Sequence, residues 1–134
     1  QKEAKDFIED AKKGVPEAQF NLALCYVKGN GVEQSYSKAV YWYEKAAIQD
    51  VVEAQYNLAR CYEDGKGVEQ SYSQAAYWLQ KAANQNHPEA QCNLAILYYT
   101  GKGVTKNKSL AIYWAQESCK NFNDKGCSFL NNIK

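Results

Sequence analysis

The sequence contains no methionine, one histidine and two prolines among its 134 residues. Because methionine is missing, Gln1 is not the original start of translation, and we expect either a removed targeting segment or a piece of a longer repeat array. No apolar run reaches the roughly 18 residues that a membrane-spanning helix needs, so no bilayer crossing is expected. With one histidine and no Cys-x-x-Cys pair, the sequence predicts neither a metal site nor a cofactor.

An excess of charge of one sign is also missing. The 16 basic and 15 acidic residues give a net charge of +1. Such an even balance offers no general attraction to nucleic acid or to an anionic membrane surface, and neither is expected as a partner. The length is sufficient for one domain, so we expect 1–134 to form a single domain.

What the sequence does contain is an internal repeat. The pattern Ala-Gln-x-Asn-Leu-Ala begins at Ala18, Ala54 and Ala90, which gives a period of 36 residues. Residues 16–51 and 52–87 are identical at 23 of 36 positions, and 52–87 and 88–123 are identical at 16. A fixed period of this length is typical of solenoids, whose units bury their apolar faces only against their neighbours.

Each repeat divides into two expected helices. A Gly-x-Gly-Val turn separates them and begins with a glycine that can end the first helix in a left-handed conformation, at Gly29, Gly65 and Gly101. Apolar residues at helical spacing precede and follow this turn. The second helix is preceded at equivalent positions by residues typical of N-caps, namely Ser35, Ser71 and Asn107.

The segments outside the three repeats resemble parts of a repeat. Shifted by one period, residues 1–15 match a second helix, and we interpret them as an N-terminal half-repeat. Residues 124–134 match a first helix and are rich in asparagine, which is consistent with a C-terminal cap. The predicted fold is therefore all-α, a right-handed α/α superhelical solenoid of helix-turn-helix repeats with about eight helices.

The repeat resembles that of the Sel-1-like family, a relative of the tetratricopeptide repeat. The family pattern Ala-x-x-x-Leu-Gly-x-x-Tyr, Gly-x-Gly-Val, Asp-x-x-Lys-Ala-x-x-Trp-Tyr is matched along nearly the whole chain. In each repeat alanine replaces the family's glycine, at Ala23, Ala59 and Ala95. Members of the family serve as adaptors and scaffolds, in bacterial signalling and host contact and in eukaryotic protein quality control. The resemblance implies a fold and a class of function, but no particular partner.

The resemblance to tetratricopeptide arrays implies that the first helices line a concave surface that binds another protein or a peptide segment. The implied contact residues are Phe20, Asn21, Leu24, Val27, Tyr56, Asn57, Arg60, Glu63, Cys92, Asn93, Ile96 and Tyr99. The three equivalent asparagines either hold the backbone of an extended peptide or brace their own repeats, and both interpretations stay open. The equivalent tryptophans are expected in the core, and they are Trp42, Trp78 and Trp114.

The five cysteines divide into two groups. Cys119 and Cys127 lie eight residues apart across the last turn between repeats, where their Cα atoms can come within disulfide range. Their spacing also resembles that of a bridged pair in cysteine-rich exported Sel-1-like proteins of bacteria, so we expect a disulfide. Cys25 and Cys61 are expected to be small buried hydrophobes, and Cys92 a free thiol near the concave surface.

One motif suggests an enzyme. The segment from Ser35 to Lys38 matches the Ser-x-x-Lys pattern of penicillin-recognising enzymes. However, Ser35 is at the expected cap position, the equivalent segments after Ser71 and Asn107 lack the lysine, and neither Ser-Asp-Asn nor Lys-Thr-Gly follows. We therefore expect no catalytic residues.

The sequence predicts a non-catalytic scaffold or adaptor for protein–protein interaction. One alternative is an exported bacterial protein that acts in host contact or neutralises a toxin enzyme, and another is a β-lactamase-like enzyme. A periplasmic or secreted location is favoured over a cytoplasmic one because of the expected disulfide. A partner could also bind the outer face of the second helices, through Tyr36, Tyr41, Tyr72 and Tyr77. The oligomeric state is not predicted.

Overall fold

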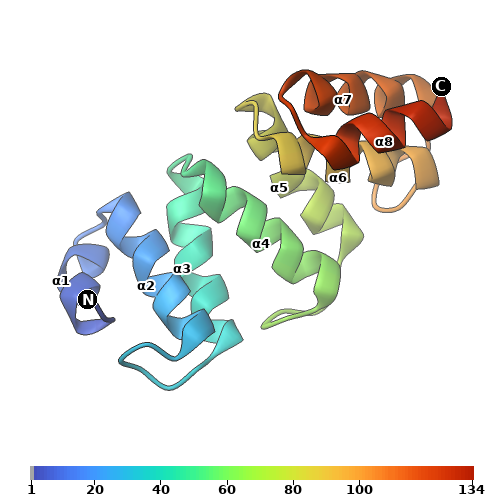
Figure 1. Ribbon diagram of the computed structural model, residues 1–134. Helices are drawn as coiled ribbons and strands as arrows, with labels where there is room; N and C mark the ends of the chain where they lie inside the picture. Colours follow the sequence, from blue (N-terminus) through green and yellow to red (C-terminus); the bar gives the residue numbers. More distant parts are fainter. Residues whose placement is uncertain (1) are drawn as a thin grey trace. The chain divides into compact units, whose positions relative to one another are not determined.

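The computed structural model describes residues 2–134, which form eight α-helices and no strand (Figure 1). Residue 1, the first of the predicted half-repeat 1–15, lies outside the described residues. The helices are α1 (Lys5–Lys12), α2 (Pro16–Lys28), α3 (Tyr36–Ile48), α4 (Val52–Asp64), α5 (Tyr72–Asn84), α6 (Pro88–Thr100), α7 (Lys108–Lys120) and α8 (Asp124–Ile133). The prediction of an all-α fold is confirmed.

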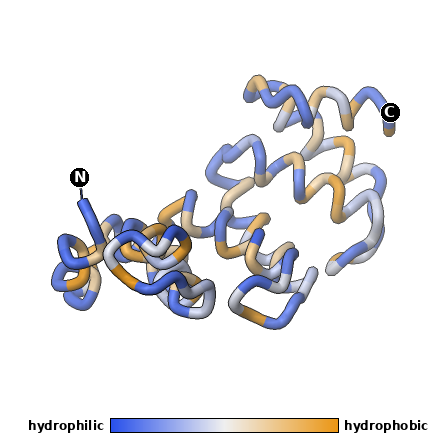
Figure 2. The backbone as a smooth tube through the Cα atoms, turned by 60° about the horizontal axis from the view of Figure 1, so that its bottom comes forward, coloured by the Kyte–Doolittle hydropathy of each residue, from blue (hydrophilic) through white to orange (hydrophobic). Residues whose placement is uncertain are grey.

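The chain forms two compact units, which we describe separately. The first unit is Gln1–Gln70 and contains α1 to α4; the second is Ser71–Lys134 and contains α5 to α8. Hydrophobic and hydrophilic stretches alternate along the helices (Figure 2), as expected for helices that bury one face. Among residues 2–134 we find no helix with the length and apolar character that a bilayer crossing requires.

The helix ends follow from the repeated turn residues. Helices α2, α4 and α6 end at glycines with φ values of 71°, 68° and 72°, the left-handed region that a glycine enters without steric cost. The side chains of Ser35, Ser71 and Asn107 accept hydrogen bonds from the backbone N–H groups of Lys38, Gln74 and Leu110. The predicted caps at both ends of the turn are confirmed.

The second glycine of the turn is required for packing. A Cβ atom on Gly67 would collide with the backbone carbonyl of Tyr36 at the start of α3, and one on Gly103 would collide with that of Tyr72 at the start of α5. The turn within each of these repeats therefore lies directly against the start of the second helix of the repeat before it.

The core consists mainly of alanine and leucine. In the first unit Ala4, Ala11, Ala18, Leu22 and Cys25 form a buried cluster. The tryptophans contribute to packing as expected, because Trp78 and Trp114 are buried and Trp42 is half-buried against this cluster. Alanine has a small side chain and therefore allows neighbouring helices to approach closely.

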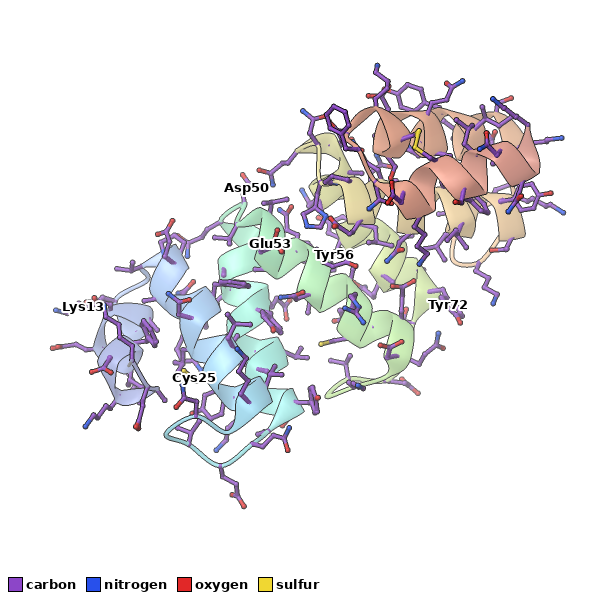
Figure 3. All side chains as sticks on the ribbon, viewed as in Figure 1. Lys13, Cys25, Asp50, Glu53, Tyr56 and Tyr72 are labelled. Carbon is purple, nitrogen blue, oxygen red and sulfur yellow. A yellow bond between two sulfur atoms is a disulfide. The ribbon has the colours of Figure 1, made fainter. Side chains whose placement is uncertain are left out.

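A buried glutamine links each first helix to the second helix before it. The side-chain amides of Gln19, Gln55 and Gln91 donate to the backbone carbonyls of Ala11, Ala47 and Ala83, each at 3.1 Å. At the last such junction the equivalent positions are Cys127 and Cys119, which form a disulfide with Cα atoms 4.5 Å apart. The bond is visible in the second unit (Figure 3). The predicted disulfide is present in the structure.

Candidate functional site

The residues predicted to contact a partner lie on α2, α4 and α6. Almost all are half-buried, and Arg60 is exposed. The half-buried residues are Phe20, Asn21, Leu24, Val27, Tyr56, Asn57, Glu63, Asn93, Ile96 and Tyr99. Those on α2 and α4 belong to the first unit, and those on α6 belong to the second.

Cys92 does not lie on an accessible surface, and this part of the prediction was wrong. Its side chain is only 1% exposed, whereas Phe20 and Tyr56, its equivalents in the other repeats, are half-buried. Helix α8 packs against α6 and brings Lys125 near the Cys92 thiol, which explains the burial. Cys92 is a core residue.

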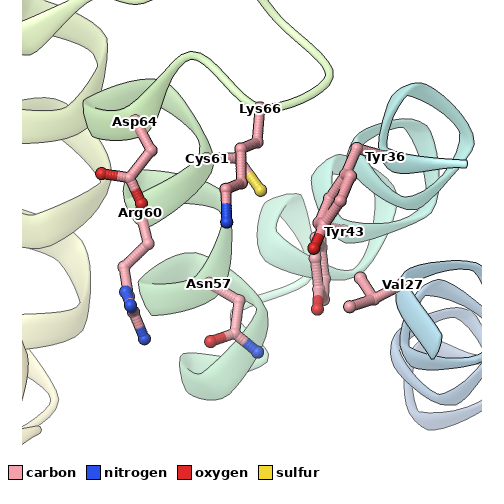
Figure 4. A pocket seen from close by; sticks show the side chains of 8 residues that line it. All are labelled: Val27, Tyr36, Tyr43, Asn57, Arg60, Cys61, Asp64 and Lys66. Carbon is pink, nitrogen blue, oxygen red and sulfur yellow. The ribbon is translucent and has the colours of Figure 1, made fainter.

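An open cavity of about 180 Å³ lies on the first unit (Figure 4). Three of its residues were predicted from the sequence: Val27 on α2, and Asn57 and Arg60 on α4. The structure brings together with them Tyr43, Cys61, Asp64 and Lys66, which the site prediction did not include. It also places Tyr36 in this cavity, and the prediction that Tyr36 lies on the outer face of the second helices was wrong. Tyr36 and Tyr43 come from α3, so the cavity combines three helices and the turn after α4.

The buried tyrosine of this cavity is hydrogen-bonded to a predicted contact residue. Tyr43 is 3% exposed, and its ring lies 6.0 Å from that of Phe20. Burial, with a smaller contribution from Cys61, raises the pKa of Tyr43 to about 12, and a hydrogen bond with the Asn57 side chain opposes this rise. Asn57 therefore links its own repeat, 52–87, to the repeat before it. The amide can still bond a ligand, because an asparagine side chain offers two donors and an acceptor.

The charges of the cavity are carried by long side chains. The Arg60 guanidinium lies 5.9 Å from the centre of the Tyr56 ring, and the Lys66 ammonium lies 5.3 Å from that of Tyr36. These two cations face one acidic residue of the lining, Asp64. The charged groups of the lining therefore carry an excess of positive charge, beside apolar surface.

The equivalent face in the second unit is more apolar. Ile96 stands where Arg60 stands in the first unit, and Leu79 where Tyr43 stands. Tyr99 packs edge-on against Phe129 of α8, with ring centres 5.7 Å apart. Asn93 is half-buried, but its neighbour at the position of Tyr43 has no hydroxyl to bond.

The outer faces of the second helices carry exposed tyrosines. Tyr41, Tyr77 and Tyr113 are 55%, 54% and 48% exposed. Each packs edge-on against the tryptophan that follows it. Two of them also lie under a lysine ammonium, Tyr41 under Lys45 at 5.1 Å and Tyr77 under Lys81 at 5.4 Å.

The remaining cysteines are buried thiols. Burial raises the pKa values of Cys25, Cys61 and Cys92 above their usual range, so their reactive thiolate forms are disfavoured. Within residues 2–134, no three histidine, cysteine, aspartate or glutamate side chains gather in a way that could hold a metal ion.

Ser35 has the geometry of a helix cap. Its Oγ accepts the backbone N–H of Lys38 at 3.2 Å and lies 3.2 Å from the Oγ of Ser37. The Lys38 ammonium lies 5.8 Å from the centre of the Tyr26 ring. Ser71 makes the equivalent bonds to Gln74 and Ser73, although its segment has no lysine. The shared geometry explains the serine without catalysis.

Comparison with solved structures gives several close matches. The chain is 32% identical to a Sel1 repeat protein from Oxalobacter formigenes, with a TM-score of 0.87 and coverage of 96% of each chain. It is 25% identical to Helicobacter pylori cysteine rich protein B, with a TM-score of 0.74 and coverage of 95% of this chain and 94% of that one. The predicted solenoid class is confirmed by these matches.

A third similar structure belongs to a protein that is longer than this chain. A protective antigen present in uropathogenic Escherichia coli strains, which displays an SLR fold, is 32% identical with a TM-score of 0.88. The match covers 94% of this chain but only 27% of the Escherichia coli protein. Comparison with curated protein sequences gives no significant match.

The family assignment comes from the repeats themselves. The Sel1 repeat family model matches residues 16–51, 52–87 and 88–121, which together are most of the chain. Sel1 repeats generally serve as scaffolds for protein–protein interaction. The chain belongs to the Sel1 repeat family.

Proposed function

We propose that this chain is a non-catalytic scaffold that holds an extended segment of another protein against α2 and α4. The observation that carries the proposal is the open cavity, because it joins predicted contact residues from two successive repeats. Val27 supplies an apolar contact, Asn57 a side-chain amide and Arg60 a charge. A peptide needs these elements, since its backbone bonds to amides while its side chains fill adjacent pockets.

The half-buried residues beside the cavity support this proposal. Phe20 and Leu24 on α2 and Tyr56 on α4 offer apolar surface on the same face. Aromatic side chains dominate the binding energy of many interfaces, because they bury a large area at a small cost in conformational entropy. In the second unit Asn93, Ile96 and Tyr99 lie on α6, and we propose that this more apolar surface also binds protein.

The test is affinity capture from a lysate of the source organism with two matched double variants. Tyr56→Ala/Arg60→Glu changes a tyrosine and the cation above its ring on α4. Tyr41→Ala/Lys45→Glu makes the same kind of change, with the same spacing, on the outer face of α3. Circular dichroism of both variants shows whether they remain folded.

The proposal predicts that wild type and the Tyr41/Lys45 variant retain the same protein, and that the Tyr56/Arg60 variant does not. Loss of the protein with the Tyr41/Lys45 variant alone would instead assign binding to the outer face of α3. If all three chains retain the same proteins, the face formed by α2 and α4 is not the binding surface.

A second candidate concerns where the scaffold acts. We infer a role outside the cytoplasm, in host contact or in neutralising a toxin enzyme, because disulfides persist in oxidising compartments. The Cys119–Cys127 bond and the likeness to a protective antigen and to a cysteine-rich protein support this inference.

Alkylation of protein taken from its native source tests the second candidate. Material trapped rapidly with an alkylating reagent should carry no label on Cys119 or Cys127 by mass spectrometry. Complete labelling of both residues would place the chain in a reducing compartment and contradict this role.

A further inference from the structure

The cavity on the first unit is lined by Arg60 and Tyr43, which differ from their equivalents in the other repeats. Arg60 occupies a position that is Leu24 one repeat earlier and Ile96 one repeat later. Tyr43 occupies a position that is Phe7 or Leu79. Asn57, Lys66 and Tyr36 recur as Asn93, Lys102 and Tyr72, so Arg60 and the Tyr43 hydroxyl are local additions to a shared framework. Together these groups point to a ligand that this combination of side chains recognises.

Hydrogen-bond donors from three sources surround this space. Figure 4 shows the Lys66 side chain reaching from the turn toward the middle of the cavity, with Arg60 and Asn57 on one side of it and the two tyrosines on the other. Guanidinium and ammonium groups carry no acceptor, and an arginine can bond both oxygens of a carboxylate. The natural ligand of such a set is an anionic oxygen pair.

The size of the cavity and its apolar wall limit which anionic groups it can bind. A volume of about 180 Å³ is below the roughly 300 to 1,000 Å³ of typical small-molecule sites, but it is sufficient for one side chain. Val27 and the ring of Tyr36 form its apolar wall. Asp64 at the edge disfavours a dense negative charge such as a phosphate, because like charges repel at short range. A single carboxylate with adjacent methylene groups fits these surroundings.

We propose that this cavity binds the carboxylate of an aspartate or glutamate side chain within the peptide segment held by the scaffold. The inference rests on the proposed function and specifies the chemistry of the partner: an extended segment with an acidic residue beside apolar ones. Arg60 and Lys66 contact the carboxylate, Asn57 bonds to it or to the adjacent backbone, and Asp64 limits the affinity.

The test is selection from a library of random peptides displayed between two linkers, so that no peptide has a free end. Wild type is compared with Arg60→Glu, with Asp64→Asn and with Lys102→Glu. The last is a matched control, because Lys102 is the equivalent of Lys66 in the next repeat and lies over Tyr72 at 5.2 Å, as Lys66 lies over Tyr36. It is outside the cavity. A second library with free carboxyl ends is screened in parallel.

Wild type and Lys102→Glu should both select peptides enriched in one acidic position with apolar neighbours. For the selected peptides, Arg60→Glu should weaken binding about tenfold to a hundredfold, because a hydrogen bond to a charged group is lost and a repulsion is added. Asp64→Asn should strengthen it. This opposite response cannot result from a folding defect.

Other outcomes separate this inference from the proposed function. Peptides selected by wild type without any acidic preference, and bound equally by Arg60→Glu, would overturn the acidic ligand and leave the scaffold in place. Acidic preference confined to the library with free ends would assign the cavity to a chain terminus and overturn the side-chain assignment. Failure of wild type to select any peptide from either library would contradict both proposals.

Discussion

The helix pairs α3–α4 and α7–α8 are built from equivalent positions of the repeat, yet their contacts differ. In the first pair a buried glutamine, Gln55, donates to the carbonyl of Ala47. In the second pair the same positions form the Cys119–Cys127 disulfide. The repeat therefore tolerates different chemistry at this position, provided that the two helices remain linked.

The exposed faces of the two pairs differ as well. On α4, Asn57 bonds to Tyr43 and lines the cavity together with Arg60. On α8, the position of Asn57 is taken by Phe129, whose ring packs against Tyr99. One face thus offers polar groups to a ligand, whereas the other is filled by aromatic packing. Shared packing positions determine the fold, whereas the face positions differ in the groups that they present.

Removing the disulfide should have the largest effect on stability. The double change Cys119→Ala/Cys127→Ala should lower the free energy of unfolding by about 2 to 3 kcal/mol, because the closed loop no longer restricts the unfolded chain. Urea unfolding of oxidised wild type and of the variant measures this difference. Equal midpoints would show that the bond contributes nothing to the α7–α8 junction.

The hydrogen bond between Gln55 and Ala47 should contribute less to stability than the disulfide does. Replacing Gln55 with leucine removes donors to the Ala47 carbonyl and to Asp50, so we expect the free energy of unfolding to fall by about 1 to 2 kcal/mol. Urea unfolding of wild type and variant measures this difference.

The similarity of the two helix pairs can be tested by introducing a disulfide between α3 and α4. In Ala47→Cys/Gln55→Cys both thiols should oxidise and resist alkylation. Thiols that remain fully reactive in the folded oxidised protein would show that the two junctions differ in geometry.

The N-terminal caps of α3 and α7 should contribute about equally to stability. Ser35→Ala and Asn107→Ala should each lower the free energy of unfolding by about 1 kcal/mol, since each removes one hydrogen bond to a backbone N–H in the first turn. Urea unfolding measures both differences.

The Ser35→Ala variant also tests catalysis. Turnover of the β-lactam nitrocefin should equal the uncatalysed rate for wild type and for Ser35→Ala. Turnover by wild type that Ser35→Ala abolishes would establish the enzyme interpretation.

A further effect centres on Tyr43 of α3 and is confined to high pH. Because folding raises the pKa of Tyr43 from 10.0 to about 12, the folded state retains a proton that the unfolded state loses. Stability from this group is complete below pH 10.0 and declines as pH rises toward 12. The thiols with raised pKa values act in the same direction from near pH 9.0.

A Tyr43→Phe variant separates these contributions. It should show a shallower decline of the unfolding free energy between pH 10 and 12 than wild type. Phenylalanine is a suitable replacement, because Phe7 occupies the equivalent position one repeat earlier. Identical slopes would mean that Tyr43 does not contribute to the pH dependence.

Much of the fold could be predicted because the same turn and cap residues recur at equivalent positions in all three repeats. The left-handed glycines and the serine or asparagine caps act within a few residues, so their positions in the sequence were sufficient. The link between Cys119 and Cys127 was also predictable, since it crosses one short turn. Gln19, Gln55 and Gln91 were seen as repeated positions, but their bonds to carbonyls depend on how helices pack.

The candidate site was only partly predictable. Val27, Asn57 and Arg60 were identified because the resemblance to tetratricopeptide arrays implies that these positions of the first helices line the concave surface. Tyr43 was overlooked because its position lies in the apolar stripe of a second helix. Its polarity becomes informative only by comparison with Phe7 and Leu79. Cys92 was misplaced because its burial depends on α8, which the repeat pattern alone does not position against α6.

The central claim is that the face formed by α2 and α4 binds an extended segment of a partner. The most direct measurement is a nuclear magnetic resonance titration of the isotope-labelled chain with a peptide selected by wild type. The account predicts that the signals of the Asn57 side chain, Arg60 and Val27 shift as the peptide is added. Shifts confined to Tyr41 and Lys45 on the outer face of α3, with those three signals unchanged, would contradict it.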